Sequence, residues 1–340
     1  MPLRFAARVG LALVAAGIIA ASAAPAPAAD MQAAKKEGEV MWYSSLSLSV
    51  AQKVCKQFND KKTGITCVLH RDGSGKIYQR YLQEAKGNVF KADVIHTSNI
   101  GHFVNMKKNH LRPYKPKGTE KFIPAFTTPD GSWNILRASV YVLAYNTKLV
   151  KPEDAPKSWA DVLNPRWKGL IAHAHPAYSG VITVGMLSLV NMHGWAYYDK
   201  LAALQPKIVQ SAVAVIPLVA RGEAHVVAGT AAYNTFGDIK KGEPIKMVLP
   251  KEGVAFISSP HSVLKKAPHP NAAEVFTDFL FSREAQQTLV ENGLHVGHPD
   301  VKYPEGLPSL QGLKIIDFTP EEVQKKSKEI QEMFRKKFGV

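Results

Sequence analysis

The sequence predicts an α/β fold with two lobes, each a mainly parallel sheet flanked by helices. Short apolar runs alternate with amphipathic stretches through most of the chain, which is typical of strands joined by crossover helices. Two segments, 139–146 and 246–254, combine a strand-like run with nearby turn residues and are expected to cross between the lobes. Two crossings leave one lobe interrupted by the other, so the lobes can hinge about a double connection.

The beginning of the chain, residues 1–29, predicts a cleavable secretory signal peptide. Arg4 and Arg8 precede an uncharged apolar run from Val9 to Ala21, and small residues in A-x-A order follow that run. The run is short for a membrane span, which needs roughly 20 apolar residues, and an uncleaved anchor is the alternative. We expect cleavage near residues 23–29 and a mature protein in an oxidising compartment, most simply the periplasm.

The predicted strands and helices follow one another in the order that such sheets require. Apolar runs bounded by turn residues predict strands at 40–43, 65–69, 93–96, 140–145, 170–172, 225–229 and 247–249. Apolar residues at helical spacing predict helices at 49–59, 75–85, 99–109, 180–192, 197–204 and 320–338. We expect lobe 1 to comprise residues 30–140 and 251–340, and lobe 2 to comprise residues 141–250.

Cysteine content and charge narrow the class of protein further. Cys55 and Cys67 flank one helix-to-strand connection, where an oxidising compartment favours a disulfide and two buried free thiols are the alternative. The net charge of +15 comes from scattered lysines, without zinc-finger spacing, an RNP-like aromatic motif or a long basic arm. We therefore expect a basic surface and no nucleic-acid partner.

Small polar residues follow several predicted strands and open the next helix. Free N–H groups and the positive end of the helix dipole meet hydroxyl donors at such a corner, and ligands of open α/β sheets bind at the carboxyl ends of strands. Any single corner is also explained as a helix cap or a turn. The corners contain Ser44 and Ser45, then Ser74 and Gly75, then Thr97 and Ser98, and finally Tyr178, Ser179 and Gly180.

Catalytic motifs are scarce in this sequence. It contains no Gly-x-Ser-x-Gly elbow, no Walker loop and no His-Glu-x-x-His motif. His173 and His175 flank one residue beside a strand end, so they share a face and suggest a weak zinc site. A secreted metal-dependent hydrolase built on this pair is the alternative from the enzyme class; we expect no enzyme, no cofactor and no bound metal.

Five segments together resemble the extracellular solute-binding family of ABC-importer periplasmic receptors, which includes ferric-ion, thiamine and 2-aminoethylphosphonate binders. The segments are YSSLSLSVAQKV, RDGSGKIYQRYL, ADVIHTSN, YVLAYNTKLVKPEDAPKSWADVLNPRWKG and IKMVLPKEGV. The resemblance implies a two-lobed periplasmic-binding-protein fold with a two-strand hinge and a ligand trapped as the lobes close. It also implies a small-molecule ligand, and a membrane permease and an ATPase as partners. We expect the receptor itself to be a monomer.

The sequence departs from the ferric members of that family where they carry two adjacent tyrosines. Tyr233 fits one of these positions, but Asn234 occupies the next, and one phenolate is a poor cage for Fe³⁺. The departure favours a small anionic organic solute, phosphonate-like or carboxylate-bearing, and a ferric receptor with unusual ligands stays as the alternative. Arg71 and Arg137 are expected to supply charge, or else to form salt bridges, and Tyr141, Tyr178 and Tyr233 are expected to form walls.

Overall fold

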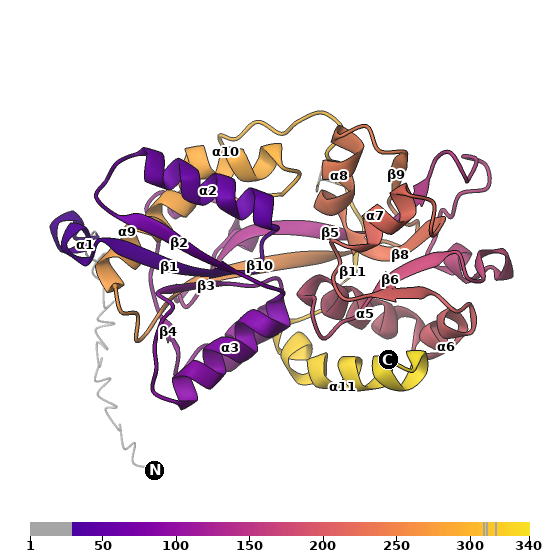
Figure 1. Ribbon diagram of the computed structural model, residues 1–340, viewed down its shortest axis with the longest axis horizontal. Coiled ribbons are helices and arrows are strands. Elements are labelled where there is room, and N and C mark those ends of the chain that lie inside the picture. Colours follow the sequence, from indigo (N-terminus) through magenta and orange to yellow (C-terminus); the bar gives the residue numbers. More distant parts are fainter. Residues whose placement is uncertain (1–28, 309, 311, 317) are drawn as a thin grey trace, which may run out of the picture.

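The computed structural model describes residues 29–308, 310, 312–316 and 318–340, and it confirms the predicted α/β fold (Figure 1). The predicted signal peptide lies, except for Ala29, outside the described residues. Within the described ranges, eleven strands form one sheet in the order β2-β1-β3-β10-β5-β8-β6-β7, with β4 and β11 paired to β10 and β9 paired to β5. No helix in this part of the chain is long and apolar enough to cross a membrane.

The first lobe occupies one end of this sheet, where β1 pairs in parallel with both β2 and β3. Helices α2, α9 and α10 cover one face, and the rings of Trp42 and of Phe276 on α9 form a T-shaped pair with 5.4 Å between their centroids. Its elements are α1 (Met31–Glu37), β1 (Glu39–Ser44), α2 (Leu48–Asp60), β2 (Thr66–Arg71), α3 (Ser74–Lys86), β3 (Val94–His96), α4 (Ile100–Met106), β4 (Leu111–Arg112), the 3-10 helices Thr119–Lys121 and Pro124–Phe126, α9 (Pro270–Leu280) and α10 (Arg283–Glu291).

The second lobe occupies the other end, where β6 pairs in parallel with β7 and β8. Helix α5 is apolar nearly all round, and it is buried along most of its length as that composition requires. The elements of the second lobe are the 3-10 helices Ala160–Leu163 and Pro165–Trp167, β6 (Ile171–Ala174), α5 (Gly180–His193), α6 (Ala196–Ala203), β7 (Lys207–Val209), α7 (Val215–Ala220), β8 (Val226–Ala231), α8 (Ala232–Lys240) and β9 (Ile245–Val248).

Two long antiparallel strands, β5 (Asn134–Asn146) and β10 (Val254–Leu264), join the lobes. Strand β5 pairs with β10 up to Val140 and with β8 from Tyr141 onward. Strand β5 therefore passes from the first lobe to the second near residue 140. Strand β10 is not among the strands predicted from the sequence. Its register with β5 shifts between Ser259 and Pro260, whose nitrogen cannot donate to a ladder.

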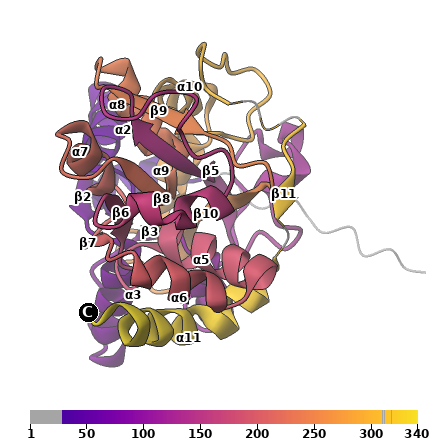
Figure 2. The ribbon, with the colours of Figure 1, turned by 90° about the vertical axis from the view of Figure 1, so that its right-hand side faces the viewer.

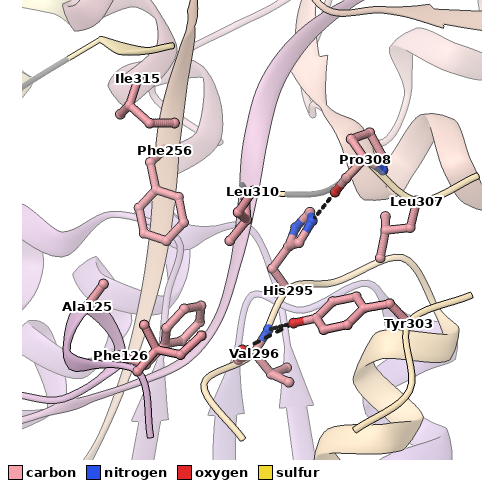
Figure 3. A pocket seen from close by; sticks show the side chains of 11 residues that line it. Ala125, Phe126, Phe256, His295, Val296, Tyr303, Leu307, Pro308, Leu310 and Ile315 are labelled. Atoms are coloured by element: carbon pink, nitrogen blue, oxygen red, sulfur yellow. Dashed lines mark hydrogen bonds between the residues drawn. The ribbon is translucent and has the colours of Figure 1, made fainter. Parts of the chain in front are cut away.

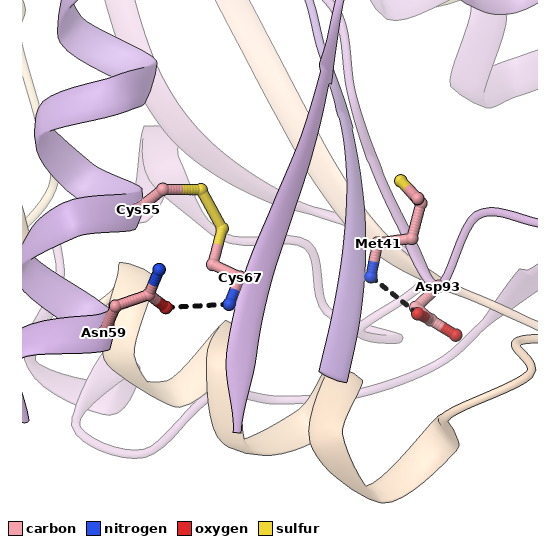
Figure 4. The surroundings of a disulfide bond; sticks show 5 residues. All are labelled: Met41, Cys55, Asn59, Cys67 and Asp93. Carbon is pink, nitrogen blue, oxygen red and sulfur yellow. Dashed lines mark hydrogen bonds between the residues drawn. A yellow bond between two sulfur atoms is a disulfide. The ribbon is translucent and has the colours of Figure 1, made fainter. Parts of the chain in front are cut away.

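A disulfide bond joins Cys55 of α2 to Cys67 of β2, which confirms the predicted pairing (Figure 4). The two Cα atoms lie 5.4 Å apart, within the range that a disulfide spans. Asn59 also accepts a hydrogen bond of 2.8 Å from the backbone N–H of Cys67. The link therefore fixes α2 against β2, the two elements that carry Ser47 at the start of the helix and Arg71 at the end of the strand.

The last helix, α11 (Pro320–Phe338), follows the short strand β11 (Ile315–Ile316) and confirms the predicted amphipathic helix. It packs against α4 of the first lobe and against α5 and α6 of the second, and Figure 2 shows it beneath these two helices. Thr319 caps its start, and its apolar side includes Val323, Ile330 and Phe334, all fully buried. The helix thus bridges both lobes on one side of the sheet.

Candidate functional site

A row of polar side chains crosses the first lobe at the carboxyl ends of its parallel strands. Ser44 ends β1 and is in register with Arg71, which ends β2, and with His96, which ends β3. His96 is in turn opposite His261 of β10. Side chains in register on neighbouring strands leave the sheet on the same face. The fold therefore gathers these four residues where ligands of α/β sheets bind.

Arg137 lies in the part of β5 that pairs with β10, and it is 0% exposed. None of its three guanidinium nitrogens has a hydrogen-bond partner among the described residues. Ser259 lies directly opposite on β10, and its hydroxyl also lacks a partner within that part of the chain. On the side of the second lobe, the Tyr233 ring lies 5.1 Å from the guanidinium carbon. A buried charge without partners is costly, so this cluster is suited to an anion.

Burial and the neighbouring charges act together on the titratable groups of this cluster. Burial lowers the pKa of Arg137, Tyr233 raises it and the positive charge of Arg71 lowers it further. Arginine nevertheless keeps its charge in proteins. Burial also lowers the pKa of His96 well below its ordinary value, and the charges of Arg137 and His261 add to this effect. The cluster therefore presents one fully buried permanent cation beside a neutral imidazole.

A cleft of about 530 Å³ opens between the lobes next to this cluster. The start of α2 forms one side with Ser47 and Ser49, and α8 forms the other with Tyr233 and Asn234. The backbone N–H of Tyr233, at the start of α8, donates to the Ser139 hydroxyl at 3.4 Å. The positive end of α2 lies at the cleft and favours negative charge there, whereas α8 lines the cleft along its length, from Tyr233 to Lys240.

The other predicted corners form a contact between the lobes. Ser74 and Ser98 lie 2.8 Å apart through their hydroxyls, and the Ser98 N–H also donates to Ser45 at 3.2 Å. Facing them, a Cβ atom built on Gly180 would lie 2.5 Å from the Ser98 carbonyl oxygen. A Cβ on Gly75 would similarly lie 2.2 Å from the carbonyl oxygen of Ala177. Backbones of the two lobes thus approach closely enough that only glycine fits.

The structure therefore divides the predicted site residues, apart from Tyr141, between two places. Ser44, Arg71, Arg137 and Tyr233 lie around the buried cluster, with Asn234 beside them in the cleft. The contact between the lobes contains Ser45, Ser74, Gly75, Ser98, Tyr178 and Gly180, and next to it lie Thr97, which precedes Ser98, and Ser179, which precedes α5.

Tyr141 is the predicted wall residue that the structure places elsewhere. Its ring is fully buried in the second lobe and stacks on Trp159 with 5.3 Å between ring centroids. Cβ atoms built on Gly185 and Gly229 would collide with this ring. Tyr141 therefore belongs to the core of the second lobe, because the β5 segment that carries it has already left β10 for β8.

Sequence reasoning missed His96, Ser259 and His261. The run VIH before Thr97 could have indicated that a histidine ends β3, but the prediction included only the hydroxyl residues that follow it. Ser259 and His261 escaped because β10 itself was not predicted. When a strand is not recognised, the alternation that would assign its polar residues to one face of the sheet cannot be applied.

His173 and His175 do not form part of this site. The His173 ring is buried beneath α11, stacks on Phe334 and shares a hydrogen bond with the Ala174 carbonyl at 2.8 Å. Across the described ranges, no group of three or more His, Cys, Asp or Glu side chains is placed to hold a metal ion. The geometry therefore gives the hydrolase alternative no support.

A larger cavity of about 800 Å³ lies in the first lobe, away from the polar row (Figure 3). Its lining is mainly apolar, including Phe126 and Phe256. His295 is bonded through Nε2 to the Pro308 carbonyl, and the Tyr303 hydroxyl is bonded to the backbone of Val296. Because no Lys, Arg, Asp or Glu among the described residues lines it, this cavity is a poor place to hold an anion.

The fold has two lobes joined by two long antiparallel strands, an arrangement that allows lobes to close around a ligand. The sequence profile of the family described as bacterial extracellular solute-binding protein matches residues 91–318, so the chain belongs to that family. This result confirms the resemblance noted in the sequence. Proteins of this family bind small ligands and work with the permease and ATPase of ABC transporters.

Several known proteins are similar to this chain over most of its length. Iron uptake protein A1 of Synechocystis sp. is 26% identical over 78% of this chain and 77% of its own. A periplasmic protein of Salmonella typhimurium named for binding 2-aminoethylphosphonate is 26% identical over 68% of this chain and 69% of its own. The periplasmic binding protein AfuA from Actinobacillus pleuropneumoniae, solved with fructose-6-phosphate, superposes with a TM-score of 0.81 at 22% identity, covering 89% of this chain and 99% of AfuA.

Proposed function

We propose that the protein is the periplasmic receptor of an ABC importer and captures a small anionic organic solute between its lobes. The observation that carries this proposal is Arg137, a fully buried guanidinium without a hydrogen-bond partner among the described residues. Its ligand carries a phosphonate, phosphate or carboxylate group, and the rest of the solute extends into the cleft between α2 and α8. We further propose export by the predicted signal, a monomeric receptor and delivery to a permease and its ATPase.

The energetics of a buried arginine support an anionic ligand. An unpaired charge in a protein interior loses its hydration without compensation, whereas a bound oxyanion restores charge-assisted hydrogen bonds to the same nitrogens. Coulombic attraction is also stronger where water is excluded. An anion at Arg137 thus stabilises the closed form of the cleft more than the open form, so binding favours closure.

The relatives support the same class of ligand without identifying the compound. Two of the similar proteins are associated by name with 2-aminoethylphosphonate and with fructose-6-phosphate, which both carry a phosphorus oxyanion. A guanidinium binds such groups through two parallel hydrogen bonds. Arg137 offers three nitrogens for this purpose, and Ser259 offers a hydroxyl beside them.

Ferric iron is the second candidate, because one similar protein is named for iron uptake. Tyr233 supplies one phenol, and Asn234, which follows it, is already bonded to Thr230 and to the Ala212 carbonyl. The charge of Arg137, 5.1 Å from the Tyr233 ring, would repel a trivalent cation. The geometry therefore favours the anionic solute.

Replacing Arg137 tests the proposal directly. Wild-type protein should show a thermal shift with at least one compound from a panel of phosphonates, phosphate esters and organic acids. At 100 times its dissociation constant such a ligand adds about 2.7 kcal/mol of stability. Arg137→Met should abolish the shift while the unliganded protein stays folded, since a flexible apolar side chain replaces an unpaired charge.

The matched control is Arg221→Met, which removes an arginine that is largely exposed beside Glu223. This variant should bind like wild type, because exposed ion pairs contribute little. Unchanged binding in Arg137→Met would overturn the proposal. Addition of ferric iron provides a separate arm, in which a visible tyrosinate absorption that Tyr233→Phe removes would favour the iron receptor instead.

A further inference from the structure

A chain of hydrogen bonds links the end of β1 to His96. The backbone N–H of Leu46 donates to the Ser44 hydroxyl at 3.2 Å, and the Ser44 oxygen lies 3.0 Å from Nδ1 of His96. Ser44 and His96 are both fully buried. Sequence reasoning treated Ser44 as a ligand contact, but its hydroxyl is engaged with the protein on both sides.

This chain determines which nitrogen of His96 carries the hydrogen. Within the described residues, the Ser44 hydroxyl has one acceptor for its own hydrogen, which is His96 Nδ1. A buried hydroxyl hydrogen without an acceptor is costly, so Ser44 donates and Nδ1 accepts. Because the pKa of His96 is lowered by burial and by nearby positive charge, the ring is neutral near pH 7. The single ring hydrogen is then on Nε2.

His96 Nε2 is buried and has no partner in the described part of the chain. The hydroxyl of Ser259 and the three nitrogens of Arg137 share this property. These groups come from three adjacent strands, β3, β10 and β5. Each can donate a hydrogen bond in these protonation states.

We propose that His96 Nε2–H and Ser259 complete, with Arg137, a donor set for a tetrahedral oxyanion of a phosphonate or phosphate ester, and that Ser44 is a positioning residue that fixes the His96 tautomer. This inference rests on the proposed function and specifies the head group of its ligand. The paired nitrogens of one guanidinium already satisfy the two oxygens of a planar carboxylate. A tetrahedral group with three oxygens has further acceptors, and the proposal assigns these to the donors on β3 and β10.

The difference between the two head groups is large enough to measure. A carboxylate at Arg137 would leave the His96 and Ser259 donors buried and unpaired, and each unpaired donor lowers affinity by about 5- to 150-fold. The site therefore discriminates by the number and direction of acceptor oxygens as well as by charge.

Three probes share the same aminoethyl group and differ in the head group: 2-aminoethylphosphonate, 2-aminoethanesulfonate and 3-aminopropanoate. Comparing their affinities separates the effect of head-group shape from that of head-group charge. Phosphate, sulfate and acetate repeat the comparison without a tail. Titration calorimetry on the wild-type protein should rank the phosphorus oxyanion first and the carboxylate last. His96→Leu should weaken phosphonate or phosphate binding by about 10- to 100-fold. It should strengthen carboxylate binding, because it removes a donor that a carboxylate leaves unpaired, so the preference should shrink to the part that Ser259 supplies. His96→Gln, which keeps a side-chain N–H donor, should restore part of it.

Ser44→Ala tests the positioning role. Nitrogen-15 NMR of the histidines should show the Nε2–H tautomer of His96 in wild type and a mixture of tautomers in this variant, with a smaller loss of affinity than in His96→Leu. An Nδ1–H tautomer of His96 in wild type would contradict the proposed positioning role of Ser44. The inference would be overturned if His96→Leu kept the head-group preference of wild type, or if wild type preferred carboxylates. In either case, loss of binding in Arg137→Met would still support the anion site. Absence of binding by every probe to wild type would count against the proposed function as well.

Discussion

Replacing Gly180 by alanine should impair closure of the two lobes without lowering the stability of the unliganded protein. The Cβ of an alanine at position 180 would lie 2.5 Å from the Ser98 carbonyl oxygen, whereas ordinary contacts begin at 3.4 Å. The lobes must therefore separate by about 0.9 Å at this point, the difference between those two distances. Overpacking of this kind costs about 1–3 kcal/mol, which corresponds to roughly 5- to 150-fold weaker ligand binding.

The same substitution should leave the open protein as stable as wild type or slightly more stable. Gly180 is the first residue of α5, and alanine is favoured over glycine in a helix by about 1 kcal/mol. Affinity for the tightest anion of the ligand panel should fall, while the urea midpoint of the unliganded protein should stay constant or rise. Small-angle scattering with the ligand should show a larger radius of gyration than for wild type.

Gly185→Ala is the matched control, because it makes the same change in the same helix. Its Cβ would meet the Tyr141 ring at 2.5 Å, within the core of the second lobe. This variant should lose stability and keep its affinity once folded, the opposite of Gly180→Ala. If Gly180→Ala lowered the urea midpoint and bound ligand like wild type, the contact at Ser98 would be part of the permanent fold and the closure argument would fail.

Three further predictions concern stability. The double variant Cys55→Ser, Cys67→Ser should lose about 3 kcal/mol of unfolding free energy, as expected for a loop with a sequence separation of 12; an unchanged denaturation midpoint would contradict this. Phe334→Ala should cost about 3–5 kcal/mol in the same assay, since this ring is fully buried between α11 and the second lobe; a cost below 1 kcal/mol would show that α11 is dispensable. Burial lowers the pKa of His102 to about 3 and of His173 to about 4. In the unfolded chain these histidines bind protons below their ordinary pKa of about 6.5, whereas in the folded protein they do not. The free energy of unfolding should therefore fall by about 2 kcal/mol per histidine between pH 7 and pH 5. The midpoint at the two pH values measures this, and His173→Gln should reduce the difference.

Local patterns in the sequence were sufficient to predict most strands of the parallel parts of the sheet. The alternation of apolar runs and amphipathic stretches placed β1, β2, β3, β6 and β8 within a few residues of their observed ends. Helices α2, α3 and α11 were predicted equally closely, because their apolar faces repeat with helical period. In these elements the residue pattern and the buried face coincide.

The sequence could not show how the strand ends divide between ligand binding and lobe contact. Ser44 and Ser45 are neighbours in the chain, yet one engages His96 and the other Ser98, because β1 ends at Ser44 and Ser45 lies outside the strand. The role of Gly180 depends on a backbone from the other lobe, 82 positions away at Ser98. Such contacts depend on the tertiary arrangement and leave no local pattern.

The position of Arg137 explains how a ligand can couple the two lobes. Its strand, β5, belongs to both lobes, and its guanidinium lies between Ser259 on β10 and the Tyr233 ring on α8 of the second lobe. An anion held there touches groups of both lobes at once, so it gains more in the closed form than in the open form. An arginine on an outer strand could bind an anion equally tightly without this difference, and a ligand with equal affinity for both forms shifts nothing. If the proposed ligand binds there, the place of this charge on the hinge strand makes capture of the solute and closure of the cleft one event.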